Sequence, residues 1–300
     1  MATGDGTIHE GRDRHVRLAR EDEFGSPPSS ADWTCLPLDG NGWSVRSARD
    51  WFLPEPAMDG ASAEPAAPGL LSPRGRLSVA PHPEAVQFLL DAALNRPAPD
   101  GLHTYCADHV TPVESRRYLG MAAAGLTLSA VADRVRIGLR LCGHDEVAGT
   151  GVTSSDFDYS GLTAVPFSLR GAHLELDGAA LEAVSGFTLR VNNDLQPGPN
   201  VGNRTAYLLA GRRTVTLRLH GLHGGSRVDE ALREGGSVGF SADFSHPAGH
   251  SMWLRLPRLL PRRSEGDGPP GRPARRTARL VAARDPSAGH DIDYGVSLSS

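Results

Sequence analysis

The stretch Leu126–Leu141, LTLSAVADRVRIGLRL, is the clearest indication of the fold class. Apolar and polar residues alternate up to Ala130 and alternate again from Val135, with Asp133 between the two runs. Successive side chains of a β-strand point to opposite faces, so this alternation is typical of strands with one buried and one polar face. The stretch therefore predicts an antiparallel hairpin.

Similar runs occur on both sides of this hairpin. In 212–220, the Val and Leu residues at odd positions alternate with Thr, Arg and His at even positions. A chain of ten or more short strands separated by turn residues is typical of an antiparallel β-sandwich or barrel. We therefore predict a mainly β protein with long loops. Besides 212–220, the further expected strands are 76–79, 115–121, 172–177, 184–192, 205–209, 237–244, 251–256, 276–283 and 291–298.

One segment has helical periodicity. Its apolar residues, from Ala85 to Leu94, recur at intervals of three and four. Pro83 and Glu84 suit a first helical turn, and Asn95 with a nearby proline suits the end. We expect one short α-helix over about 82–95.

Proline and tryptophan set the N-terminal part of the chain apart. Residues 26–73 hold eight Pro and three of the four Trp. A tryptophan ring left in water costs a few kcal/mol, so a segment this rich in Trp is expected to dock on a surface. We predict a partly extended N-terminal arm at 1–73 and a β-rich domain at 74–300. Long loops are expected at 144–166 and, as a flexible loop, at 261–275.

Charge excludes several classes of function. The net charge is -4, which argues against a generally polybasic nucleic-acid binder. All basic residues are Arg, and the absence of Lys excludes Schiff-base and P-loop lysine chemistry. Segment 255–284 holds nine Arg against two acids, which suits contact with an acidic neighbour or a solvated loop. We interpret the polar face at Arg134, Arg136 and Arg140 as an ordinary solvated face in preference to a DNA contact.

Cysteine usage and hydropathy point to a soluble protein made in the cytoplasm. The three cysteines, at 35, 106 and 142, lack zinc-site spacing and are expected to be reduced thiols. The N-terminus shows no secretory signal. The longest apolar stretch, Met121–Ala132, is too short and too polar to span a bilayer, so no membrane insertion is expected.

No residue group stands out as a catalytic or metal site. Four groups were considered and are interpreted as surface histidines or solvated turns: His220 with His223, His246 with His250, His144–Glu146, and Asp156 with Asp158. Carboxylate pairs that are distant in the chain stay open. The sequence predicts no catalytic, cofactor-binding or metal-binding residues, no cofactor and no enzymatic activity.

Several short segments follow one another in a recognisable order. They are Glu21–Pro27, Gly75–Val79, Leu89–Leu94, His103–Tyr105, Arg116–Gly120, Leu126–Ala130, Phe187–Leu195 and Arg213–Leu217. In their order and spacing, over roughly residues 20–260, they resemble the tail-tube proteins of tailed bacteriophages and of phage-derived tail machines. In that family a Tyr-x-Gly step, here Tyr118 to Gly120, precedes the central hairpin. An Asn-Asn-x-Leu-like segment, here Asn192–Leu195, closes a later strand.

The resemblance implies a structural subunit with a β-sandwich or barrel of the tail-tube type. Such subunits form homo-hexameric rings that stack into a hollow tail tube, through which DNA or effector passes transiently. The partners implied are further copies of the chain, terminator, baseplate or sheath proteins, and a tape measure protein inside the lumen. The implied location is the tail of a virion or phage-like particle.

Two departures from the family pattern leave open a related tail component. Segment 33–73 is longer and richer in Trp and Pro than the pattern, and the Arg-rich segment 255–284 is a local elaboration. From other classes, the alternatives are a secreted-type β-sandwich carbohydrate-binding or adhesion module and, less favoured, a β-rich hydrolase. A carbohydrate-binding module needs a solvent-facing aromatic cluster on its strands, whereas most Trp residues here lie in the predicted arm.

Overall fold

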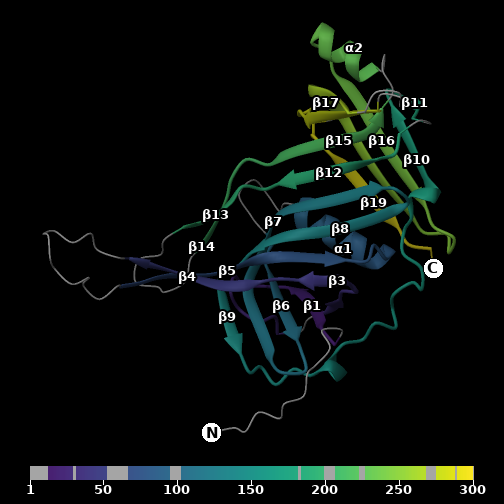
Figure 1. The fold of residues 1–300 in the computed structure, drawn as a ribbon. Helices are drawn as coiled ribbons and strands as arrows, with labels where there is room; N and C mark the ends of the chain where they lie inside the picture. The colour runs from purple at the N-terminus through teal and green to yellow at the C-terminus, as the bar shows by residue number, and fades with distance from the viewer. Residues whose placement is uncertain are drawn as a thin grey trace, which may run out of the picture.

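A computed structural model describes residues 13–29, 32–52, 67–94, 103–181, 184–198, 207–222, 227–267, 275–287 and 289–299. Within these residues the chain is mainly β, as predicted, with a large antiparallel sheet and two α-helices (Figure 1). The helices are α1 (Pro83–Leu94) and α2 (Arg227–Glu234). The strands are β1 (His15–Arg20), β2 (Thr34–Cys35), β3 (Leu38–Trp43), β4 (Arg46–Phe52), β5 (Ala67–Val79), β6 (Tyr105–Val110), β7 (Ser115–Val131), β8 (Arg134–Cys142), β9 (Asp145–Ala148), β10 (Ala172–Leu176), β11 (Ala179–Ala180), β12 (Gly186–Asn192), β13 (Leu195–Gly198), β14 (Tyr207–Ala210), β15 (Thr214–Leu222), β16 (Val238–Ser245), β17 (Ser251–Asp267), β18 (Arg275–Ala282) and β19 (Asp293–Ser297).

The predicted central hairpin is confirmed as β7–β8. Leu128 lies opposite Ile137 in the register, and both side chains are buried. The turn residues Ala132 and Asp133 have φ values of 51° and 64°. Two consecutive positive φ angles form the tight turn whose twist matches that of antiparallel strands. The alternation in the sequence therefore corresponds to one face in the core and one face in solvent.

Strand β7 joins two parts of the sheet. Its first half pairs with β6 and β9, and its second half pairs with β8 and β12. A register shift between Ala123 and Gly125 lies where the partners change. On one side β6 continues to β1 and β2; on the other, β12 continues through β15, β18, β17 and β16 to β10. One contiguous core extends under both parts.

Helix α1 confirms the predicted helix to within a residue at each end. Its apolar side is buried against β7, β8 and β19, with Leu89 and Leu90 almost wholly excluded from solvent. Helix α2 was not predicted. It has only two turns; its apolar residues, Val228, Ala231 and Leu232, follow the three- and four-residue spacing of a helix, but the segment is too short for that spacing to stand out.

Two predicted loops are partly strand. Within 144–166, Asp145–Ala148 forms β9, which pairs with β7, and a single 3-10 turn follows at Ser154–Asp156. The prediction of a loop at 261–275 is wrong for 261–267, because β17 continues to Asp267 beside β18. Pro261 suggested a loop, but it lies at a register shift in the β17–β18 pair, where a proline does not end the strand. Residues 268–274 lie outside the described part.

The first strands of the chain belong to the same sheets as the later ones. Strand β1 pairs with β6, β4 pairs with β5, and the predicted boundary at residue 73 falls inside β5. Trp43 is 4% exposed and packs in the chain's own core. The side chain of Trp51 lies outside the described part. A role of residues 1–73 as an arm between subunits stays a prediction.

Candidate assembly framework and surfaces

The buried carboxylate of Glu21 connects two distant segments. It accepts hydrogen bonds from the backbone N–H of Gly25 at 3.0 Å and of Gly120 at 2.7 Å. Gly120 has a φ of +61°, and a Cβ there would lie 2.5 Å from the Cβ of His144. The ring of Phe24 packs on that histidine, with 4.8 Å between ring centroids. The N-terminal segment is thereby anchored where β7 passes between the two parts of the sheet.

Asn193 makes a second connection. Its side chain is buried, and Nδ2 donates to the carbonyl oxygens of Ala93 and Ala123, both at 2.9 Å. The carbonyls at the C-terminal end of a helix lack partners within the helix, and Asn193 supplies one for α1. Arg213 supplies another by donating to the Leu94 carbonyl at 3.0 Å. The end of β12, the end of α1 and the bulge of β7 are fixed to one another by these bonds.

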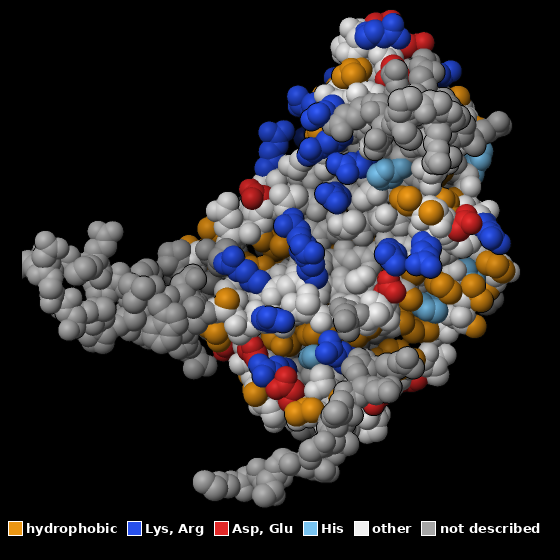
Figure 2. Space-filling view, in the orientation of Figure 1, with side chains coloured by type: hydrophobic (Ala, Val, Ile, Leu, Met, Phe, Trp, Pro, Cys, Tyr) orange, Lys and Arg blue, Asp and Glu red, His pale blue; other side chains and the backbone are white. Residues whose placement is uncertain are grey.

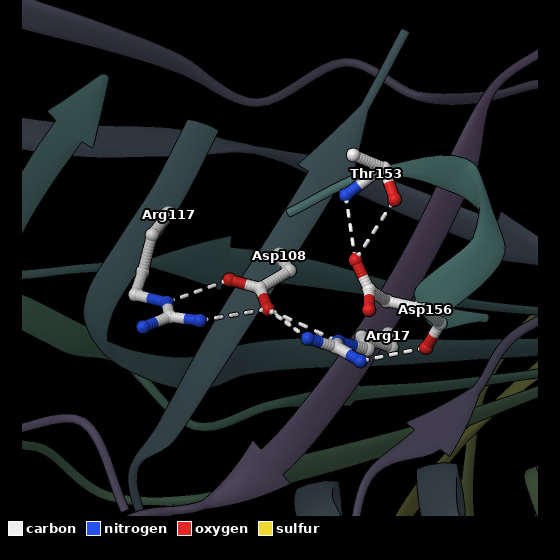
Figure 3. Close-up of polar contacts among 5 residues, drawn as sticks. All are labelled: Arg17, Asp108, Arg117, Thr153 and Asp156. Atoms are coloured by element: carbon white, nitrogen blue, oxygen red, sulfur yellow. Dashed lines mark hydrogen bonds and ion pairs between the residues drawn. The ribbon is translucent and has the colours of Figure 1, made fainter. Parts of the chain in front are cut away.

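Asp108 on β6 forms the third connection, a buried ion-pair network (Figure 3). Its carboxylate is fully buried and binds Arg17 of β1 at 3.0 Å and Arg117 of β7 at 2.7 Å. The carboxylate raises the pKa of Arg117 because it stabilises the charged guanidinium through hydrogen bonds. Arg17 also donates to the Asp156 carbonyl at 2.7 Å, and its guanidinium lies 4.3 Å from the centre of the Trp33 ring. The network joins the first strand to the loop that follows β9.

These three connections bring together the segments whose order resembles a known family. Glu21 and Phe24 meet the Tyr118–Gly120 step, and Asn193 follows the strand at Phe187. A family model described as phage tail tube protein matches residues 11–271. The chain belongs to the phage tail tube protein family. No curated protein matches the chain at a significant level.

As a phage tail tube protein, the chain is a structural, non-enzymatic component of the virion tail. The family match contains all three connections, from Glu21 to Asn193. Sequence reasoning missed Glu21 and Asp108 as structural residues because each acts through partners that are distant in the chain. The one available signal for Glu21 was its place in a segment that resembles the family's opening.

His220, Asp156 and Asp158 have structural partners within the protein. His220 Nε2 lies 3.1 Å from the Thr188 hydroxyl, while His223 lies outside the described part. Asp156 accepts a hydrogen bond from the Thr153 N–H, and Asp158 accepts one from the Ser160 N–H. Among the described residues, no group of three or more His, Cys, Asp or Glu side chains is placed to hold a metal ion.

The interpretation of His246 and His250 as surface histidines is wrong, because both are buried in a hydrogen-bond network near the start of α1. His246 Nε2 donates to the Val165 carbonyl, and His250 Nδ1 accepts from the Ser299 N–H. His250 Nε2 lies 3.1 Å from the hydroxyl of Thr163, which in turn binds Glu84. The network fastens the loop before β10 and the last described residues to the body of the protein.

His144 and Glu146 are likewise engaged. His144 packs on Phe24, and Glu146 accepts hydrogen bonds from Arg116 and Ser47.

No helix in the described ranges is both long enough and apolar enough to cross a membrane.

Several elements present surfaces that the core does not use. Among the described residues, β13 and β14 pair only with each other and form a separate two-stranded sheet. Tyr207 and Leu209 on β14 are 39% and 51% exposed. Strands β2, β9, β11 and β19 each pair on one side only within the described part. An unpaired strand edge offers its N–H and C=O groups to a neighbouring chain.

Proposed function

We propose that copies of this phage tail tube protein assemble into hexameric rings, which stack into a hollow tube that conducts DNA or effector. The observation that carries the proposal is the separate β13–β14 hairpin, which exposes Tyr207 and Leu209 in a member of a tube-forming family. An exposed aromatic and an exposed leucine on one short hairpin suit the apolar centre of an interface with a second copy.

Strand edges supply the contacts within a ring. The main sheet ends at β3 and β4 on one side and at β10 and β11 on the other. Sheets from neighbouring subunits that continue one another around a ring leave no free edge, which removes the tendency of edges to aggregate. The broad, antiparallel sheet of this subunit supports such a closure.

We assign the contacts between rings to two pairs of strands, β13–β14 and β4–β5. In Figure 1, β13–β14 and the hairpin of β4 with β5 lie on the same side of the molecule. We propose that this side meets the next ring and that residues 1–73 contribute to the contact as an arm. Terminator, baseplate or sheath, and tape measure proteins are the further partners of such a tube.

The described aromatic side chains do not favour a carbohydrate-binding or adhesion module. Trp43 is buried, and the ring of Trp33 is covered by the guanidinium of Arg17. A glycan platform needs flat rings that are open to solvent. The family membership also leaves no support for a hydrolase.

A pair of matched double variants tests the proposal. Tyr207→Ser with Leu209→Ser removes the apolar centre of the hairpin, whereas Val113→Ser with Val165→Ser removes exposed apolar side chains elsewhere. Static light scattering and negative-stain electron microscopy would follow polymerisation of both variants and of the unmodified chain. We expect tubes from the unmodified chain and the control, and arrest at single rings or monomers for the hairpin variant. Tubes of unchanged length from the hairpin variant would contradict the assignment.

A further inference from the structure

Eight arginines of the described residues lie together on the solvent face of the main sheet. Figure 2 shows basic side chains that extend from the upper part of the view through its middle, over the strands of the main sheet. They come from six strands, and the neutral residues between them are mostly Ser and Thr. We call this set the arginine face: Arg76, Arg134, Arg136, Arg140, Arg190, Arg218, Arg263 and Arg279.

The register places like charges directly opposite one another. Arg76 on β5 lies opposite Arg140 on β8, and Arg279 on β18 lies opposite both Arg218 on β15 and Arg263 on β17. Directly opposed side chains in antiparallel strands have Cβ atoms about 5 Å apart, and like charges there are destabilising. An anion bound on this face would relieve the repulsion between Arg76 and Arg140 and between Arg218 and Arg279.

Few carboxylates among the described residues lie close to the arginines of this face. Arg136 faces Asp39 at 3.5 Å, and Arg140 donates to the neutral Asn192 side chain at 2.6 Å. For Arg190 and Arg218, no carboxylate of the described part of the chain lies within ion-pair distance. The pKa of His220 is lowered, first by burial and then by the charge of Arg218, which agrees with a positive potential on this face.

A small hollow lies within the arginine face. It has a volume of about 100 Å³ and is lined by Arg190, Arg218, Arg279, Thr188 and Thr216, with a part of Leu217. Guanidinium and hydroxyl groups are the usual protein partners of phosphate oxygens, and Arg binds them through two parallel N–H donors. The hollow thus combines the donors and the charge that a phosphate group requires.

We propose that the arginine face binds the phosphate backbone of nucleic acid without preference for base sequence. The strands that form it contribute none of the exposed large apolar side chains of the described residues, so the face lacks the apolar centre typical of protein–protein interfaces. Flat polar sheets with regularly spaced arginines suit a uniform polyanion. The solvated-face interpretation of Arg134, Arg136 and Arg140 changes because the register adds five arginines beside them.

Fluorescence anisotropy on the full chain tests this inference. The probes are two labelled 30-base-pair duplexes of unrelated sequence, titrated at several salt concentrations from about 50 to 200 mM. We expect equal affinity for both duplexes and a linear fall of log affinity with log salt, with a slope of about -0.9 for each phosphate contacted.

Matched triple variants distinguish binding by the arginine face from a general effect of net charge. Changing Arg190, Arg218 and Arg279 to Gln is expected to weaken binding by about tenfold or more and to reduce the salt slope by about 2 to 3. The same three changed to Lys should retain most of the affinity. Changing the exposed Arg20, Arg227 and Arg233 to Gln removes the same charge elsewhere and should alter affinity less than about twofold.

Three outcomes would overturn the inference: absence of binding at the lowest salt, an equal loss in the control triple, or poly-glutamate binding more tightly than DNA. The last outcome would assign the face to an acidic protein partner.

Thermal unfolding by circular dichroism verifies that each variant is folded. The single variant Arg218→Gln should show a smaller loss of DNA affinity in the same direction. The readout is DNA binding and not polymerisation, so a failure here is separate from a failure to form tubes.

Discussion

The carboxylate of Glu21 accepts a hydrogen bond from the backbone N–H of Gly120 across 99 positions of sequence, at a distance of 2.7 Å. It also accepts one from Gly25, so both of its oxygens are used. Residues that precede the first helix are thereby fixed to the strand that links the two parts of the sheet. This bond makes the N-terminal segment a part of the subunit fold.

Glu21→Gln should destabilise the subunit by about 1–3 kcal/mol, because the amide NH2 group replaces one acceptor and leaves a buried N–H unpaired. Urea unfolding followed by circular dichroism measures the change in the free energy of unfolding. The exposed Glu23→Gln is the control and should change it by less than about 0.5 kcal/mol. Equal effects of the two variants would show that the Glu21 bonds do not hold the segment.

Gly120→Ala tests the close approach at the same site. Gly120 and Gly149 both have positive φ, at +61° and +68°, but only at Gly120 would a Cβ collide with His144 and Phe24. We expect Gly149→Ala to cost about 1–2 kcal/mol for the backbone conformation alone. Gly120→Ala should cost at least about 1 kcal/mol more in the same denaturation experiment, because overpacking adds to it. Identical costs would contradict the packing described around Phe24.

Asp108→Asn removes the negative charge that two arginines share. Breaking a buried ion pair leaves an uncompensated charge and typically costs about 3–5 kcal/mol. We expect a loss of this size in the free energy of unfolding. Asp133→Asn breaks the exposed contact with Arg170, whose side chains are 65% and 82% exposed, and should cost about 0–1 kcal/mol. A loss of less than 1 kcal/mol for Asp108→Asn would show that solvent reaches the network.

Stability should fall in mildly acidic solution because of His109. Burial, followed by the charge of Arg14, lowers the pKa of His109 to about 4 from an ordinary value of 6.5. The unfolded chain binds a proton below about pH 6.5, whereas the folded chain does so only near pH 4, so stability is lost as the pH falls through that window. The ring stacks on Trp43 with 5.5 Å between centroids.

His109→Phe keeps an aromatic ring beside Trp43 and should reduce the dependence of the unfolding free energy on pH between about 6.5 and 4. Denaturant midpoints measured at half-unit pH steps provide the comparison. A slope of unchanged size in His109→Phe would attribute the acid sensitivity to other groups.

The sequence predicted those elements whose signals are local. Alternation identified β7–β8 and β15, and the 3–4 spacing identified α1. Helix α2 was missed because its two turns hold only three apolar residues, and the end of β17 was missed because its proline and arginine residues are typical of a loop. In each case pairing or packing with distant residues outweighed the local composition.

The arginine face could be predicted only in part, because it depends on the pairing of strands that are distant in the sequence. Arg134, Arg136 and Arg140 were visible as one side of a strand, but Arg190, Arg218 and Arg279 join them only through the register of strands far apart in the sequence. Likewise, no local pattern brings Glu21 to Gly120 or Asn193 to Ala93. The resemblance to tail-tube proteins supplied the family, and the structure supplied the contacts within it.

Formation of rings by the purified full chain tests the central claim most directly. Negative-stain electron microscopy with class averaging, on samples whose mass is followed by light scattering, measures the symmetry of any assembly. We expect hollow rings with six-fold symmetry that stack end to end into tubes. A chain that stays monomeric at high concentration, or rings without a central channel, would contradict it.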